Sequence, residues 1–228
     1  MVDVANANAV AVLTRAPSAG GKQRLFAALG RPVDPALLEA LLLDTIDGAA
    51  SAGAPMVLSL AGEADGLGIG QLGIAGDLHV IQQPIGHLGE RMRGTMAALF
   101  AAGARRVALI GSDLPAITAT PIREAFRLLE LEPASLVLGP ALDGGYYLIA
   151  ATVVPPVFDD IEWGSGRVLA QTCAAAAAAG MPVRLVAPMA DVDTVEDLIR
   201  LPARAVRSVA WSRANGLTAA SARARASS

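Results

Sequence analysis

Two acidic segments, far apart in the chain, carry the clearest potential for chemistry. Gly111–Pro115 contains Asp113 and follows the apolar run Val107–Ile110, which predicts a buried strand. Asp113 would then lie just beyond the carboxyl end of a strand, where open α/β sheets bind ligands. Asp191 and Asp193 precede a predicted short helix. If folding joins the two segments, their oxygens form a pocket that suits Mg²⁺, and hence a phosphate-bearing substrate.

Each of these aspartates also has an ordinary structural explanation. Asp113 precedes Leu114-Pro115, where an aspartate commonly bonds to nearby backbone amides in a turn. Asp193 and Glu196 have the spacing of a capping box at the start of the last predicted helix. Capping and metal binding can use different oxygens, so the spacing leaves open whether Asp191 or Asp193 binds the cation.

The loop after the first predicted strand, residues 14–25, combines glycines with positive charge. Gly20 and Gly21 allow backbone amides to approach a phosphate, and Lys22 and Arg24 add positive charge beside them. The loop lacks the glycine and the serine or threonine that a Walker loop needs. A phosphate-binding loop and a surface loop with solvated basic residues are equal alternatives at this point.

Two further loops contain candidate binding residues. Asp143-Gly144-Gly145 joins two predicted strands, and Asp-Gly pairs are ordinary hairpin turns. The functional alternative is a loop that admits a substrate close to its backbone, with Asp143 or Tyr146 touching it. Gln83, after the third predicted strand, could hydrogen-bond a nucleobase edge, and Arg91 could equally be a solvated helix residue.

The composition of the 228 residues excludes several classes of function. A net charge of −3 argues against a nucleic-acid partner, because the total charge does not indicate a basic surface. Cys173 is the single cysteine, so neither a disulfide framework nor a cysteine-built zinc site is available. Acidic residues at 39, 44 and 47 interrupt the best candidate for a membrane span, and Asp3 argues against a secretory signal. We therefore expect a cytoplasmic protein.

Two other motifs are set aside. Gly68–Gly73 matches the dinucleotide-binding glycine fingerprint by letter, but it neither follows a strand directly nor precedes a convincing helix. We interpret it as a loop. His79 and His87 are the only histidines and no nucleophile elbow accompanies them, so a Ser-His-Asp hydrolase has little support.

Strands and helices alternate through the first half of the chain, which favours a parallel sheet with helices on both faces. In the second half two strands meet through a short loop, so we predict a three-layer α/β/α, Rossmann-like fold with a mixed, mainly parallel sheet. The predicted strands are residues 9–13, 56–60, 78–81, 107–110, 135–140, 146–150 and 183–186. The predicted helices are residues 35–52, 88–102, 120–131, 165–179 and 194–200. Residues 1–202 would form one domain, followed by an Ala/Arg-rich tail, 203–228, made of a peripheral helix and a disordered end.

Six segments in the same order resemble the GT-A-type nucleotide-diphospho-sugar transferase superfamily. The nearest likeness is to a bacterial glycosyltransferase-like family with kinship to 2-phospholactate guanylyltransferases. The resemblance covers roughly residues 9 to 200. The segments are residues 15–25, Asp44-Thr45, residues 83–92, residues 111–115, residues 139–148 and residues 191–198.

This resemblance implies a GT-A fold and assigns roles to the candidate residues. Asp113 takes the place of a metal aspartate, and Asp191 or Asp193 that of the second ligand. The implied catalytic residues are Lys22, Arg24 and Asp113; the nucleotide-binding residues are Arg15, Pro17, Gly20, Gly21, Gln83 and Gly86; the acceptor-binding residues are Asp143, Gly144, Gly145, Tyr146 and Trp163. The chain departs from the family pattern at Gln23, where threonine is usual, at His87, where aspartate is usual, and around Trp163-Gly164-Ser165-Gly166.

The superfamily hosts two chemistries, and both use Mg²⁺ or Mn²⁺ with a nucleotide. The basic first loop tilts the prediction modestly to nucleotidyl transfer from a nucleoside triphosphate to a small phosphorylated acceptor. The alternative is glycosyl transfer from a nucleotide sugar, in which the acceptor pocket near Asp143 and Trp163 matters more. A nucleotide-binding protein without turnover is the third hypothesis. The sequence leaves a homodimer open.

Overall fold

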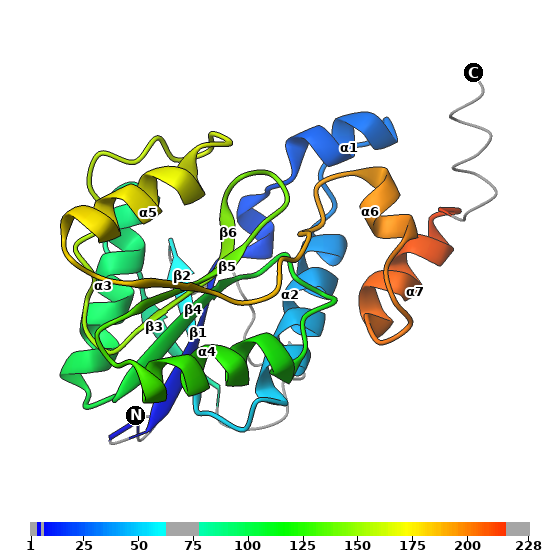
Figure 1. Ribbon diagram of the computed structural model, residues 1–228. Coiled ribbons are helices and arrows are strands. Elements are labelled where there is room, and N and C mark those ends of the chain that lie inside the picture. Colours follow the sequence, from blue (N-terminus) through cyan, green and yellow to red (C-terminus); the bar gives the residue numbers. More distant parts are fainter. Residues whose placement is uncertain (1–3, 6, 63–77, 218–228) are drawn as a thin grey trace.

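The residues described by the computed structural model, which are 4, 5, 7–62 and 78–217, contain seven strands that form one sheet (Figure 1). In chain order the strands are β1 (Asn8–Arg15), β2 (Met56–Ala61), β3 (His79–Gln82), β4 (Arg106–Gly111), β5 (Leu136–Pro140), β6 (Tyr146–Ala151) and β7 (Val183–Leu185). Across the sheet the order is β3-β2-β1-β4-β6-β5-β7. The seven predicted strands therefore all exist, within a few residues of the expected bounds.

The sheet is mixed, and a single strand runs against the others. β1 pairs parallel with β2 and β4, and β3 continues the parallel half beside β2. β6 pairs antiparallel with both β4 and β5, and β7 is parallel to β5. The prediction of a mixed, mainly parallel sheet is confirmed, because the short hairpin between β5 and β6 reverses the chain once.

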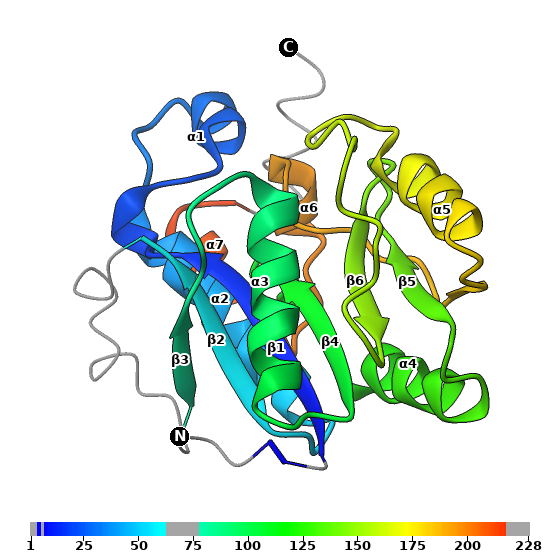
Figure 2. The ribbon, with the colours of Figure 1, turned by 90° about the vertical axis from the view of Figure 1, so that its left-hand side faces the viewer.

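Helices cover both faces of the sheet, so the fold has the three layers predicted. α2 (Pro35–Ala50) and α4 (Ala119–Leu131) pack on one face. α3 (Leu88–Ala101) and α5 (Val168–Ala178) pack on the other, and Figure 2 views the sheet with α3 in front of it.

Strand sequences explain this burial on both faces. Along β1, Val10 and Val12 pack toward α2 and α4, whereas Ala9 and Ala11 pack toward α3. Side chains of a strand point alternately to opposite faces, so a central strand covered on both sides needs an unbroken apolar run. The run at residues 9–13 predicted this position correctly.

One helix was not predicted. α1 (Gln23–Leu29) begins inside the segment interpreted as a loop, so Arg24 lies on a helix, and a 3₁₀ turn, η1 (Pro17–Ala19), precedes it. A helix of this length has little stability of its own. It is held in place by Leu25 and Phe26, which are buried against α6 (Val195–Ile199) and against Trp211, a residue far along the chain.

The C-terminal helix α7 (Val206–Ala214) packs against α2. The buried carboxylate of Asp44 accepts hydrogen bonds at 2.8 Å from both the backbone N and the Oγ of Ser208, and thereby caps α7 from another helix. Trp211 Nε1 donates to Asp34, the cap of α2, at 2.8 Å. The expected helix in the tail is therefore present, whereas a domain boundary at residue 202 stays a prediction.

Three expectations concern segments outside the described residues. They are the glycine fingerprint at Gly68–Gly73, the end of the tail that contains Arg223 and Arg225, and the acidic start of the chain at Asp3. Among the described residues, no helix has both the length and the apolar character to cross a membrane.

Candidate functional site

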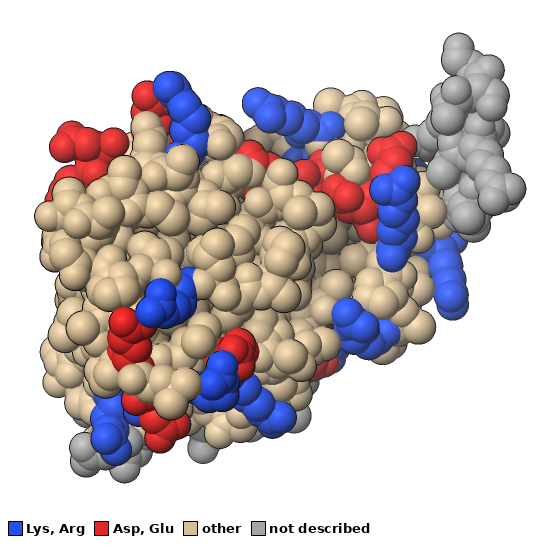
Figure 3. Space-filling view, in the orientation of Figure 1, with Lys and Arg blue, Asp and Glu red and all other residues tan. Residues whose placement is uncertain are grey.

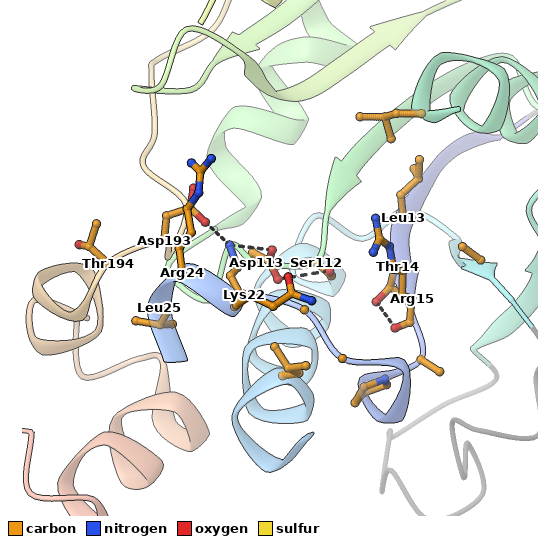
Figure 4. A pocket seen from close by; sticks show the side chains of 18 of the residues that line it. Leu13, Thr14, Arg15, Lys22, Arg24, Leu25, Ser112, Asp113, Asp193 and Thr194 are labelled. Atoms are coloured by element: carbon orange, nitrogen blue, oxygen red, sulfur yellow. Dashed lines mark hydrogen bonds and ion pairs between the residues drawn. The ribbon is translucent and has the colours of Figure 1, made fainter. Parts of the chain in front are cut away.

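The two acidic segments meet at the carboxyl end of β4, which is the condition that the sequence analysis set for an oxygen-rich pocket. A backbone hydrogen bond of 3.1 Å from Val192 N to Asp113 O joins them directly. Their carboxylates converge on the ammonium of Lys22, with Nζ–Oδ distances of 2.9 Å to Asp113, 2.5 Å to Asp193 and 4.0 Å to Asp191. Figure 4 shows Lys22 reaching between Asp113 and Asp193.

Thr45 holds the backbone on either side of Asp113. Its fully buried hydroxyl lies 3.0 Å from the carbonyl oxygen of Ser112 and accepts a hydrogen bond of 3.0 Å from the amide of Leu114. The same hydroxyl lies 2.8 Å from the carbonyl oxygen of Leu41, one turn back along α2. Thr45 therefore positions Asp113 without touching its side chain, a role that the sequence pattern did not reveal.

The capping box before α6 is one residue later than predicted. Thr194 is the cap, its hydroxyl accepts from Asp197 N, and the Asp197 carboxylate accepts from Thr194 N at 2.8 Å. The prediction that Asp193 and Glu196 form this box is therefore wrong. Because Thr194 supplies the cap, the Asp193 carboxylate is available to pair with Lys22.

Lys22 is placed by unusual backbone geometry. It precedes α1 in the left-handed conformation, with φ of 51°, and its side chain is only 10% exposed. Burial alone would lower the pKa of this ammonium. The carboxylates of Asp113 and Asp193 together outweigh burial, so the pKa is raised above its usual value.

Asp191 is the carboxylate with the most perturbed proton affinity. Burial and the neighbouring charge of Asp193 raise its pKa to about 6, although Lys22 pulls in the opposite direction. A carboxylate in this state exchanges protons close to neutral pH, which is a property expected of an acid or base in a reaction.

The donor atoms here suit a hard cation, but their present partner is an ammonium. Within the described ranges, no group of three or more His, Cys, Asp or Glu side chains has a ready metal-binding arrangement. Carboxylate oxygens are nevertheless the ligands that Mg²⁺ and Mn²⁺ prefer. The three aspartates could hold such an ion if Lys22 moved away from them.

A pocket of about 890 Å³ opens beside this cluster, a size in the usual range for small-molecule sites. We call it the basic pocket, because Arg15, Lys22, Arg24 and Arg91 line it. Asp113, Asp193 and Glu196 line it as well. Its lining includes every residue predicted to bind nucleotide except one: Arg15, Pro17, Gly20, Gly21 and Gln83 are present, and Gly86 is absent.

Gly86 instead shapes the turn before α3. Its carbonyl accepts from Arg91 Nε at 2.8 Å, and its φ is 143°. A Cβ at this position would lie 2.0 Å from the carboxylate of Glu90. Gly86 thus holds Arg91, which lines the pocket, and its own role in nucleotide binding stays a prediction.

Two other residues of this segment have structural roles that the sequence did not specify. The amide nitrogen of Gln83 donates to the carbonyl oxygens of Ser59 at 2.6 Å and Thr14 at 3.3 Å, so it ties the ends of two strands together. His87 caps α3, with Nδ1 accepting from Gly89 N at 3.2 Å and Glu90 completing a capping box. The departure from aspartate at His87 thus keeps a capping function.

A second pocket, of about 350 Å³, adjoins the first. We call it the apolar pocket, because most of its wall is hydrophobic or aromatic. The wall includes Met92, Leu109, Ile149, Tyr146 and Trp163, with Asp143, Asp191 and Gly145 at its polar parts. Asp143 accepts from Gly145 N at 2.9 Å, which confirms the hairpin turn predicted here.

The hairpin turn brings together the two acceptor segments predicted from the sequence. A Cβ on Gly144, which has a φ of 89°, would lie 2.1 Å from the carbonyl oxygen of Gly166. Only glycine allows this approach. The rings of Tyr146 and Trp163 then meet edge to face, with centroids 6.5 Å apart, and burial raises the pKa of the Tyr146 phenol.

The two pockets share Leu13, Leu88, Ser112 and Asp113. Asp113 therefore stands where the contents of one pocket would meet the contents of the other. Ligands bound in the two pockets would therefore lie side by side at Asp113.

Comparisons with known proteins agree with this geometry. A solved structure of a proposed nucleotide-diphospho-sugar transferase from Desulfovibrio desulfuricans G20 is 27% identical, with a TM-score of 0.79 over 93% of this chain and 99% of that one. A nucleotidyl transferase from Methanothermobacter thermautotrophicus is 17% identical, with a TM-score of 0.61 over 89% of this chain and 99% of that one. A CMP:2-keto-3-deoxy-manno-octonic acid synthetase in complex with CTP is 13% identical, with a TM-score of 0.57 over 91% of this chain and 100% of that one. The curated proteins contain no significant match.

The fold is the Rossmann-like α/β sandwich of the GT-A-like nucleotide-diphospho-sugar transferase superfamily, as the sequence resemblance implied. Within it, a family model matches residues 45–165, which is more than half of the 228 residues. The chain belongs to this family, described as uncharacterized protein conserved in bacteria (DUF2064).

Proposed function

We propose that the protein is a transferase that takes a nucleoside triphosphate or a nucleotide sugar as donor and passes part of it to a small acceptor. The observation that carries this proposal is the meeting of the basic pocket and the apolar pocket at Asp113. The structural neighbours described as nucleotidyl and nucleotide-sugar transferases support it, because they have the same fold.

The donor belongs in the basic pocket. Arg15, Lys22, Arg24 and Arg91 line it and would balance the charge of a di- or triphosphate. Transfer from a polyphosphate builds negative charge on the departing phosphates, so fixed cations beside them stabilise the transition state. A donor of this kind also gives Lys22 a second set of oxygens to bind in place of the carboxylates.

A divalent cation fits the same junction. Asp113 with Asp191 or Asp193 would hold Mg²⁺ or Mn²⁺, since all three present oxygen donors around one point now filled by the Lys22 ammonium. When bound, such an ion supplies neutralisation of phosphate charge. Lys22 would then leave the carboxylates and turn to the phosphates of the donor.

Nucleotidyl transfer is the first of two reactions to consider. An acceptor oxygen attacks the α-phosphorus of the nucleoside triphosphate, a new P–O bond forms, the bond to the β-phosphate oxygen breaks, and pyrophosphate departs. The number of cations that line the basic pocket favours this reaction, because a triphosphate carries more charge than a diphosphate.

Glycosyl transfer from a nucleotide sugar is the second candidate, and the apolar pocket favours it. Asp143 and Asp191 line that pocket and could accept a proton from an acceptor hydroxyl as it attacks the sugar. In this reaction a bond forms at the anomeric carbon, and a nucleoside diphosphate departs. The 27% identity to the Desulfovibrio protein adds support.

Product analysis distinguishes the two reactions. The purified protein is incubated with Mn²⁺ and each nucleoside triphosphate, and separately with nucleotide sugars, together with a panel of small acceptors. Pyrophosphate release indicates nucleotidyl transfer, and nucleoside diphosphate release indicates glycosyl transfer. Nucleotide binding without either product would instead support the hypothesis of a binding protein without turnover.

The matched variants for this experiment are Asp113→Ala and Asp160→Asn. Asp113 lines both pockets, whereas Asp160 lies in an exposed loop and lines neither. Asp113→Ala should abolish product formation and Asp160→Asn should preserve it. If no nucleotide binds to the unmodified protein by calorimetry, the proposed function is wrong.

A further inference from the structure

The chemistry of the apolar pocket restricts the molecule that it can hold. Its hydrophobic wall comes from both sheet and helix: Leu109 and Ile149 lie on neighbouring strands, and Met92 faces them from α3. The edge-to-face pair of Tyr146 and Trp163 closes one side. A ligand that fills about 350 Å³ against these groups needs an apolar surface, such as a ring or a short chain.

The charges of the apolar pocket all have one sign. Among the described residues that line it, the ionisable acids are Asp113, Asp143 and Asp191, and no lysine, arginine or histidine is present. Lys22, which lines the basic pocket, pairs with Asp113 at 2.9 Å and lies 4.0 Å from Asp191, whereas Asp143 forms no ion pair with a described residue. Arg167, which follows Trp163 by four residues, is exposed and paired with Glu162.

An anionic acceptor would meet repulsion from Asp143, which is not one of the three aspartates proposed to hold the cation. Sites that bind phosphate or carboxylate groups present arginine or lysine side chains or free backbone amides to them. In the hairpin turn, the amide of Gly145 is already used by Asp143. Like charges within a few ångströms in a partly desolvated pocket weaken binding by about tenfold or more for each pair.

We infer that the acceptor is an uncharged hydroxyl compound with an apolar ring or chain, and that it carries no phosphate or carboxylate group. This inference rests on the proposed function, and it replaces the expectation of a phosphorylated acceptor. The hydroxyl oxygen forms the new bond to phosphorus or to the anomeric carbon. Its proton passes to a carboxylate of the pocket, and pyrophosphate or a nucleoside diphosphate departs with the bonding electrons.

Fluorine NMR tests this inference directly, because the chain contains only two tryptophans. Trp163 lines the apolar pocket, and Trp211 packs against Phe26 of α1 outside it. In protein labelled with 5-fluorotryptophan, the Trp163 resonance reports on this pocket and the Trp211 resonance serves as an internal reference. Trp163→Phe assigns the two signals.

The probes are matched pairs that differ by one phosphate: phenyl β-glucoside against its 6-phosphate, and benzyl alcohol against benzyl phosphate. The alcohols should shift the Trp163 resonance, with dissociation constants at least about tenfold lower than those of their phosphates. Tighter binding of the phosphates would overturn the inference. A Trp163 resonance that responds to neither member of either pair would overturn it as well.

A charge variant then identifies the source of the discrimination. Asp143→Asn keeps the oxygen that accepts from Gly145 N and removes one negative charge, so the preference for the alcohols should narrow by about threefold to tenfold. Asp160→Asn removes the same charge outside both pockets and should leave the preference unchanged. An equal effect of the two variants, or none from Asp143→Asn, would contradict the proposed role of the pocket carboxylates.

Calorimetric titration with nucleotide and Mn²⁺ separates this inference from the proposed function. Nucleotide binding together with a preference for phosphates disproves the acceptor class alone. A preference for alcohols without nucleotide binding disproves the transferase alone and leaves the apolar pocket as a site for uncharged hydroxyl compounds.

Discussion

The basic pocket and the apolar pocket are built by different parts of the sheet. The basic pocket takes its residues from the parallel half, from the end of β1, the turn and helix that follow it, and the start of α3. The apolar pocket depends on β6, the single reversed strand, and on the hairpin that precedes it. The reversed strand places a compact loop next to the basic pocket, and this loop forms part of the second pocket beside the first.

The two pockets also differ in charge and in surroundings. Arginines, Lys22 and three carboxylates line the basic pocket, whereas the charged groups that line the apolar pocket are all carboxylates. In Figure 3, charged side chains gather around α1 and α6, while the surface over α5 carries few of them. Asp113 lines both pockets, so it must function next to cationic side chains in one pocket and next to apolar groups and carboxylates in the other.

The largest expected effect comes from removing that junction. Asp113→Ala should reduce metal-dependent nucleotide affinity by more than about 100-fold, because even outer partners of metal ligands are worth about 10- to 100-fold. Calorimetry with Mn²⁺ and nucleotide measures this, and circular dichroism checks that the fold is kept. Asp160→Asn, which changes an exposed residue that lines neither pocket, is the control and should have a small effect. Unchanged affinity in Asp113→Ala would remove Asp113 from the site.

The next largest effect concerns Thr45, which holds the backbone on either side of Asp113. Thr45→Val should lower the free energy of unfolding by about 1–3 kcal/mol, because the Leu114 amide and the Ser112 carbonyl lose a buried partner. Nucleotide turnover should fall as Asp113 loses its fixed position. Thr45→Ser retains the hydroxyl and should restore most of both properties in urea unfolding and activity assays. A loss in Thr45→Ser without a loss in Thr45→Val would show that the methyl packing matters rather than the hydrogen bonds.

Lys22→Ala should affect the cation and the nucleotide in opposite directions. Without nucleotide, Mn²⁺ affinity should rise by about tenfold, because the ammonium no longer competes for Asp113 and Asp193. Triphosphate binding should weaken more than monophosphate binding. Arg24 lines the same pocket but forms no ion pair with these carboxylates. Arg24→Ala should therefore leave Mn²⁺ affinity unchanged. Equal losses for triphosphate and monophosphate would exclude a role of Lys22 at the outer phosphates.

The smallest effect is a pH dependence of stability caused by Asp191. Its folded-state pKa of about 6 lies above the ordinary value of 3.8, so the folded state disfavours the ionised form. Stability should therefore decrease as pH rises from about 4 to about 6, and the loss should persist above that range. The side chain is 31% exposed and beside Lys22, so we expect a loss of about 1 kcal/mol.

Asp191→Asn should abolish this pH-dependent loss and stabilise the protein at neutral pH by the same amount. Urea unfolding at pH 4.5 and 7 measures both effects. Asp143→Asn serves as a control, because Asp143 makes the smallest contribution to the raised pKa of Asp191. The same pH dependence in Asp191→Asn as in the unmodified protein would show that another group titrates.

Local patterns predicted most elements, and tertiary contacts decided the exceptions. The cap at Asp34 and the proline after it predicted the start of α2, and Asp34 indeed accepts from Ala36 N. α1 escaped prediction because Leu25 and Phe26 are stabilised by Trp211, which lies far along the chain. The capping register before α6 was also ambiguous, since Asp193 and Thr194 both precede a carboxylate by three residues.

The amino-acid sequence alone determined the alternation of apolar strands and amphipathic helices, and it placed Asp113 at the end of a buried strand. These features depend on hydrophobic periodicity, which is local. Only the tertiary structure decided that Asp191 and Asp193 meet Asp113 around Lys22. It also decided that a glycine contact between two loops closes the apolar pocket, whose charged residues are all aspartates. Those decisions depend on packing between distant segments, for which residue spacing carries no signal.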